Sequence, residues 1–130
     1  MNSNDLKQRT KVFAHRCIHL AMALPRTFLG NHVQGQIIRS STSVPANYRA
    51  ACRAHSKAGF ISKISIVLEE VDETLFWLEF VAEEKLLPPK KMELLIKEAD
   101  ELTAIFTTTR KSARIKPIEN RKSKIENAKV

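Results

Sequence analysis

Arg49 and His55 are the residues whose types and spacing come nearest to a catalytic arrangement. They stand six residues apart, and an arginine can hold a phosphodiester while a histidine takes up or delivers its proton. On one continuous helix the two side chains would point in different directions, and no acid, metal cluster or nucleophile-base pair accompanies them in the sequence. We therefore expect a protein that is not an enzyme and keep catalysis as a remote alternative.

The remaining histidines and cysteines give weaker signals. His15 and His19 are four residues apart, a spacing that can chelate a metal, but no third ligand lies nearby in the sequence. Cys17 and Cys52 lack the spacing of metal or redox motifs and are better explained as small packing residues. The sequence predicts neither a metal site nor a cofactor.

Cations at helical spacing suggest binding to phosphates instead. Arg39, Arg49 and Arg53 recur with Thr42 and Ala46 at spacings of 3, 4, 3 and 4, and Lys57 follows one turn later. Further basic residues lie near the C-terminus: Arg110, Lys111, Arg114, Lys116, Arg121, Lys122, Lys124 and Lys129. Such groups bind RNA or DNA independently of sequence. Since Tyr48 is the only aromatic residue near the first group, we expect no base-specific readout.

The net charge of +8 is distributed unevenly along the chain. Residues 1–63 contain ten Lys and Arg and one acidic residue, residues 64–109 four and eleven, and residues 110–130 eight and two. The basic blocks can therefore bind nucleic acid, contact the acidic block of another copy, or simply be a solvated surface.

One long helix, from Ser56 to Lys85, organises the predicted fold. Its apolar stripe repeats at spacings of 3 and 4 and consists of Ile61, Ile64, Leu68, Val71, Leu75, Leu78 and Ala82, with Phe60, Val67, Thr74 and Val81 on its flank. Ser56 is the expected N-cap. A helix of this kind needs partner helices, because its own burial does not offset the entropy lost on ordering.

A second face of that helix carries Ile66, Phe76, Trp77 and Phe80, and one bundle core cannot bury both faces. We expect these four residues to form a subunit interface, because aromatic patches of this size are seldom left in water. The alternatives are that they cover loops, or that a monomer uses Phe76, Trp77 and Phe80 as an adaptor face for another protein.

Three further amphipathic segments complete the pattern. The first is capped by Ser3 or Asn4 and ends near Pro25, the second starts near Asn31 and kinks at Pro45, and the third follows Pro89. Short connections favour an all-α, antiparallel up-and-down four-helix bundle over residues 1–114. Residues 115–130 are predicted to be a mobile, disordered basic tail. Without a signal sequence or membrane span, we expect a cytoplasmic protein.

The segment from Gln36 to Phe80 resembles the four-helix-bundle proteins encoded by intervening sequences in bacterial large-subunit ribosomal RNA genes. The family pattern is matched at Gln36, Arg39, Ser43, Val44, Pro45, Asn47, Ser56, Phe60 and Glu70. Many members have a Glu-Gly pair shortly after the Asn, where this chain has an arginine and an alanine, in NYRAACRA. Any role of that acid is therefore not carried over.

The resemblance implies a homopentamer and a relationship to accessory proteins of diversity-generating retroelements, which bind nucleic acid and a reverse transcriptase. The Arg49 and His55 pair is in addition similar to the motif of the HEPN helical ribonucleases. Together these observations predict a non-enzymatic, oligomeric protein that binds RNA or DNA, with a reverse transcriptase-like or other protein as a further possible partner.

Overall fold

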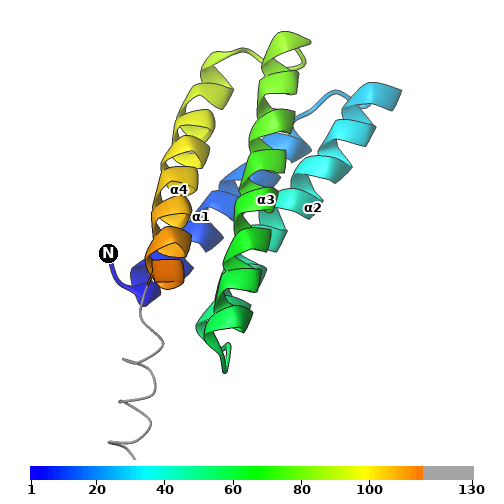
Figure 1. Cartoon of the computed structure of the whole chain (residues 1–130). Coiled ribbons are helices and arrows are strands. Elements are labelled where there is room, and N and C mark those ends of the chain that lie inside the picture. The colour runs from blue at the N-terminus through cyan, green and yellow to red at the C-terminus, as the bar shows by residue number, and fades with distance from the viewer. Residues whose placement is uncertain (116–130) are drawn as a thin grey trace, which may run out of the picture.

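Four α-helices make up the computed structural model, which describes residues 1–115 (Figure 1). They are α1 (Ser3–Met22), α2 (Phe28–Cys52), α3 (Lys57–Glu83) and α4 (Lys90–Ile115). Successive helices run in opposite directions, so the N-terminus and the end of α4 lie at the same end of the molecule (Figure 1). The predicted all-α four-helix bundle is confirmed. Of the predicted tail, Ile115 is the last residue of α4, and residues 116–130 lie outside the described residues.

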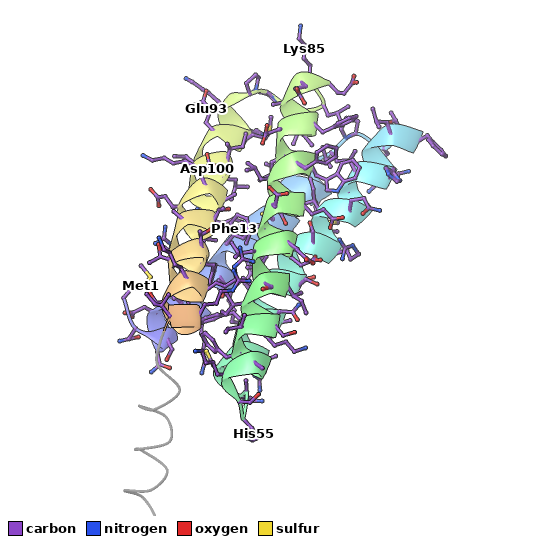
Figure 2. The ribbon with its side chains drawn as sticks, viewed as in Figure 1. Met1, Phe13, His55, Lys85, Glu93 and Asp100 are labelled. Atoms are coloured by element: carbon purple, nitrogen blue, oxygen red, sulfur yellow. The ribbon has the colours of Figure 1, made fainter. Side chains whose placement is uncertain are left out.

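Each helix packs mainly against its neighbours in the chain, and α1 also contacts α4, less extensively. The largest fully buried side chains come from all four helices: Phe13, Ile37, Ile64, Leu78, Met92, Leu102 and Phe106. Phe13 lies midway along the bundle (Figure 2). Each such side chain contributes about 1.5–3 kcal/mol on burial. No helix within residues 1–115 is both long and apolar enough to cross a membrane.

The buried face of α3 is rotated from the predicted stripe. Ile64, Leu68, Val71 and Leu78 are buried as expected, but Ile61, Leu75 and Ala82 are only partly buried. The predicted flank supplies the rest of the core through Val67, Thr74 and Val81, each fully buried. The rotation follows from packing, because α3 contacts α2 on one side and α4 on the other.

Two predicted helix starts are wrong by a few residues. Asn2 caps α1, since its side chain accepts a hydrogen bond from the Asp5 amide at 2.8 Å and the Asp5 carboxylate accepts one from the Asn2 amide at 3.2 Å. Thr27 caps α2, where its hydroxyl accepts from the Gly30 amide at 3.0 Å. Asn31 already donates to the Thr27 carbonyl, so it lies inside the helix.

The expected cap of α3 is confirmed, as the Ser56 hydroxyl accepts a hydrogen bond from the Gly59 amide at 2.9 Å. Pro45 lies inside α2, which continues on both sides of it. The kink at Pro45 stays a prediction. Next to it, the Asn47 side-chain amide donates to the Ser43 carbonyl at 2.9 Å.

An ion-pair cluster joins α1 to α4, which among the contacting pairs of helices touch least extensively. Arg9 donates to both carboxylate oxygens of Glu98, at 2.8 and 2.6 Å, and to Glu101 at 2.6 Å. The Glu98 side chain is only 16% exposed. Hydrogen bonding to Arg9 lowers the pKa of Glu98 below its ordinary value. The cluster therefore holds a charged carboxylate in a largely buried place.

Candidate nucleic-acid interface

The predicted basic stripe lies on the exposed face of α2. Arg39, Thr42, Ala46, Arg49 and Arg53 are all exposed, as the 3-4-3-4 spacing requires of side chains on one face of a helix. Thr42 turns its hydroxyl back onto the Ile38 carbonyl at 2.7 Å. The three arginines are therefore the charged groups that this face presents to solvent.

Arg39 differs from the other two arginines, because acids of α3 engage it. One guanidinium nitrogen lies 3.2 Å from Glu70 Oε2, and another pairs with Glu73. The Arg39 side chain is 50% exposed, so it can still be reached from solvent. With two carboxylates offsetting its charge, Arg39 contributes less positive potential than Arg49 or Arg53.

Among residues 1–115, the other predicted cations lie at the end of the bundle where α2 ends, α3 begins and α4 ends. There Lys57 Nζ donates to the Arg114 carbonyl at 3.3 Å, and Arg110 approaches the Ser65 hydroxyl at 3.4 Å. We call this surface the basic end and define it by six residues: Arg49, Arg53, Lys57, Arg110, Lys111 and Arg114. His55, labelled in Figure 2, marks the α2–α3 turn at this end.

Two features of the basic end bear on what it can bind. Arg110, Lys111 and Arg114 border an open hollow of about 300 Å³ whose described lining, with Thr107 and Ile115, belongs entirely to α4. This is a surface feature rather than a cleft of the kind that encloses a small substrate. Cations also stabilise the ends of α2 and α4 electrostatically, because carbonyl groups there are partly negative.

The α2–α3 turn changes the geometry assumed for the Arg49 and His55 pair. Because α2 ends at Cys52, His55 lies beyond the helix, and the helical angle no longer separates the two side chains. Both are exposed. Within residues 1–115 no three His, Cys, Asp or Glu side chains form a group that could hold a metal ion. Burial raises the pKa of Cys17 to about 12, which keeps its thiol protonated at neutral pH.

The aromatic face of α3 is largely turned toward its own chain. Trp77 makes edge-to-face contacts with Phe76 and Phe80, with ring centroids 4.9 and 5.7 Å apart, and with His32 of α2 at 5.6 Å. Trp77 and Phe80 pack against the core and are only partly exposed, as is Ile66. Phe76 is 55% exposed. The assignment of these residues to a subunit interface stays a prediction.

His32 was not recognised from the sequence as part of this face. It lies on a different helix from Trp77, and the antiparallel register of α2 and α3 brings the two rings together. Phe28, one turn earlier on α2, is 94% exposed. In the sequence, only the spacing of Phe28, His32 and Arg39 along one face of α2 could have indicated that the aromatic face extends from α3 onto α2.

Several residues that carry the family resemblance have structural roles. Arg39 and Glu70 tie α2 to α3, Ser56 caps α3, and Asn47 bonds the backbone beside Pro45. In this part of the chain the motif is therefore explained by helix ends and helix pairing.

Comparison with known proteins gives a consistent result. The family model described as 23S rRNA-intervening sequence protein matches residues 2–108. Among solved structures, the chain is similar to a protein of unknown function from the S23 ribosomal protein family of Bacteroides thetaiotaomicron. The two share 32% sequence identity with a TM-score of 0.75, over 85% of this chain and 99% of that one. No curated protein matches significantly.

Proposed function

The chain belongs to the 23S rRNA-intervening sequence protein family, and from this premise we propose that it is a non-enzymatic, homo-oligomeric protein that binds nucleic acid through phosphate contacts. The observation that carries the proposal is the basic end. Three helix ends carry cations at this end of the bundle, from Arg49 on α2 to Arg114 on α4, and Lys57 contacts the Arg114 carbonyl. Lysine and arginine side chains that neutralise phosphates give affinity that does not depend on base sequence.

The surroundings of the basic end support binding without base readout. Proteins that read or hold single-stranded bases usually stack them on exposed aromatic rings. Tyr48, the aromatic residue nearest to Arg49 in the chain, is 4% exposed and packs against Phe106, with ring centroids 5.2 Å apart. It offers no stacking surface to a nucleic acid. Recognition would then depend on the shape and charge of the phosphate backbone.

Assembly would strengthen this binding. The homopentamer implied by the family resemblance repeats the basic end once per copy, and several weak contacts on one nucleic acid multiply into a higher overall affinity. The proposal therefore includes a link between the mass of the assembly and the strength of binding. A monomeric form should bind RNA or DNA more weakly than the assembled protein.

A salt series tests the proposal directly. Labelled RNA and duplex DNA are titrated with the intact protein between low and physiological salt, while light scattering records the mass of the protein. We expect the logarithm of the binding constant to fall linearly with the logarithm of salt concentration, with a slope near 0.9 per phosphate neutralised on duplex DNA. No binding to either nucleic acid at low salt would contradict the proposal.

A further inference from the structure

The exposed side of α3 carries an acidic stripe that no other helix covers. Glu69, Asp72, Phe76, Glu79 and Glu83 follow one another at spacings of 3, 4, 3 and 4, and all five are exposed. None of the four carboxylates has an ion-pair partner within residues 1–115. Phe76 lies in the middle of the stripe. The surface thus combines a line of negative charge with one exposed aromatic ring.

The C-terminal segment starts close to the helix that bears this stripe. The hydrogen bond from Lys57 Nζ to the Arg114 carbonyl places the end of α4 beside the first turn of α3. After Ile115, residues 116–130 include Lys116, Arg121, Lys122, Lys124 and Lys129 against two acidic residues. The basic segment that follows Ile115 therefore begins beside the N-terminal turn of α3.

The chain that follows Arg114 is long enough to reach the acidic stripe of α3. With a rise of 1.5 Å per residue, Glu69 and Glu83 lie about 18 and 39 Å along α3 from Lys57. A chain that leaves Arg114 nearly extended, at about 3.3 Å per residue, brings Arg121 to about 23 Å and Lys124 to about 33 Å. Arg121, Lys122 and Lys124 can thus reach the level of the acidic stripe while their own chain still connects them to α4.

We propose that residues 116–130 bind along the acidic stripe of α3 in the same chain, with Arg121, Lys122 and Lys124 opposite its carboxylates and an apolar or cationic side chain over Phe76. The opposite charges attract each other, and connection through α4 raises the effective concentration of the segment. A cation over the Phe76 ring would add a favourable contact. The same face of a second copy would instead place carboxylates opposite carboxylates.

The contact has a consequence for nucleic-acid binding, and this consequence alone depends on the function proposed above. A segment held on the acidic stripe has fewer cations free for phosphates, so the stripe and the nucleic acid compete for the same lysine and arginine side chains. The intact protein then binds nucleic acid less tightly than a form whose segment is released.

Carbodiimide coupling of the intact protein tests the contact itself. The reagent joins lysine amines to carboxylates that touch them, and mass spectrometry of the digested protein identifies the linked residues. We expect links from Lys122 or Lys124 to Asp72 or Glu79. They should disappear at high salt, with the helical circular dichroism unchanged. In a mixture of isotopically labelled and unlabelled protein, the links should join residues of one chain.

Two charge-reversed variants serve as a matched pair. Asp72→Lys with Glu79→Lys reverses the charge of the two central carboxylates of the stripe, whereas Glu93→Lys with Asp100→Lys makes the same change of charge on exposed positions of α4 (Figure 2). We expect the second variant to keep the links. In the first, where positions 72 and 79 can no longer be coupled, Lys122 and Lys124 should not couple to the remaining Glu69 or Glu83 either. Absence of the links in the intact protein at low salt would overturn the proposal, as would links only between labelled and unlabelled chains or equal loss in both variants.

The same pair separates the contact from its consequence. If nucleic acid binds, the stripe variant should bind more tightly than the α4 variant of equal charge. If neither variant binds nucleic acid while the intact protein forms the links, the proposed function fails and the contact stands.

Discussion

Gly30 lies so close to the backbone carbonyl of Pro25 that a methyl group added to it would overlap the carbonyl oxygen. The contact fixes the turn between α1 and α2, where the Gly30 amide also donates to the Thr27 hydroxyl. Gly35, five residues later on the same helix, has nothing within 4 Å of the place where a Cβ would be. Two glycines of α2 therefore have different reasons to be there.

Alanine at these two positions should have opposite effects on stability. Gly30→Ala forces the turn to move and should cost about 1–3 kcal/mol, as overpacking does. Gly35→Ala should stabilise the protein by about 0.5–1 kcal/mol, because alanine loses less backbone entropy in a helix. Urea unfolding followed by circular dichroism measures both. A stable Gly30→Ala variant would mean that the turn is free to open.

Replacement of Glu98 by glutamine should weaken the join between α1 and α4 in a pH-dependent manner. The pKa of Glu98 is lower in the folded chain than in the unfolded one, so its contribution is complete above the unfolded pKa and disappears as pH falls through the folded pKa. At pH 7 we expect Glu98→Gln to cost about 1.5–3 kcal/mol, the range for a hydrogen bond to a charged group. The difference from the native protein should shrink in acid.

The control for this experiment is Glu93→Gln, an exposed position at the start of the same helix. It should change the free energy of unfolding by less than about 0.5 kcal/mol, as is usual for surface substitutions. An equal effect of both substitutions across the pH range would show that Arg9 does not hold Glu98 in solution.

The fold could be predicted from the sequence because helical periodicity is strong in all four segments. Ile64, Leu68, Val71 and Leu78 were placed in the core correctly, since a stripe at this spacing determines which face of a helix is buried. The contribution of Val67 and Val81 to the core was underestimated, because burial at the flank of the stripe depends on where the neighbouring helices lie. The start of α2 was missed because Thr27, which is also a favourable N-cap residue, stands closer to the turn than Asn31.

The candidate site was less accessible to sequence reasoning. Spacing along one helix predicted the exposed face with Arg49 and Arg53, but the pairing of Arg39 with Glu70 and Glu73 depends on the register between two helices. The same holds for the contact of Lys57 with Arg114, 57 residues apart in the sequence. Periodicity assigns a residue to a face and leaves open which other helix that face meets.

Charge reversal at the basic end should abolish nucleic-acid binding. Arg49→Glu with Arg53→Glu replaces two phosphate-binding groups by groups that repel phosphates, so we expect loss of binding to RNA and DNA at physiological salt. Helicity should remain, with a small loss of stability because acids are unfavourable at the end of a helix. Filter binding or fluorescence anisotropy measures the affinity.

Arg26→Glu with Lys90→Glu provides the comparison, since it makes the same change of net charge at exposed positions near the opposite end of the bundle. It should reduce binding only modestly, through the weaker overall field. Equal loss in the two variants would point to net charge rather than to the basic end as the cause of binding.

Phe76 is the residue on which two explanations for the aromatic face disagree. If residues 116–130 cover it, Phe76→Asp should leave the mass of the assembly unchanged and keep the carbodiimide links, since it adds a carboxylate to the stripe. If the ring belongs to a subunit interface, as the sequence predicts together with Ile66, Trp77 and Phe80, burying a charge there should produce monomers. Leu94→Asp, at an α4 side chain that is 67% exposed, controls for the added charge. Phe76 is the residue to change, because Trp77 and Phe80 pack against the core and cannot be replaced without disturbing the fold. Light scattering of both variants at equal concentration decides between the two explanations.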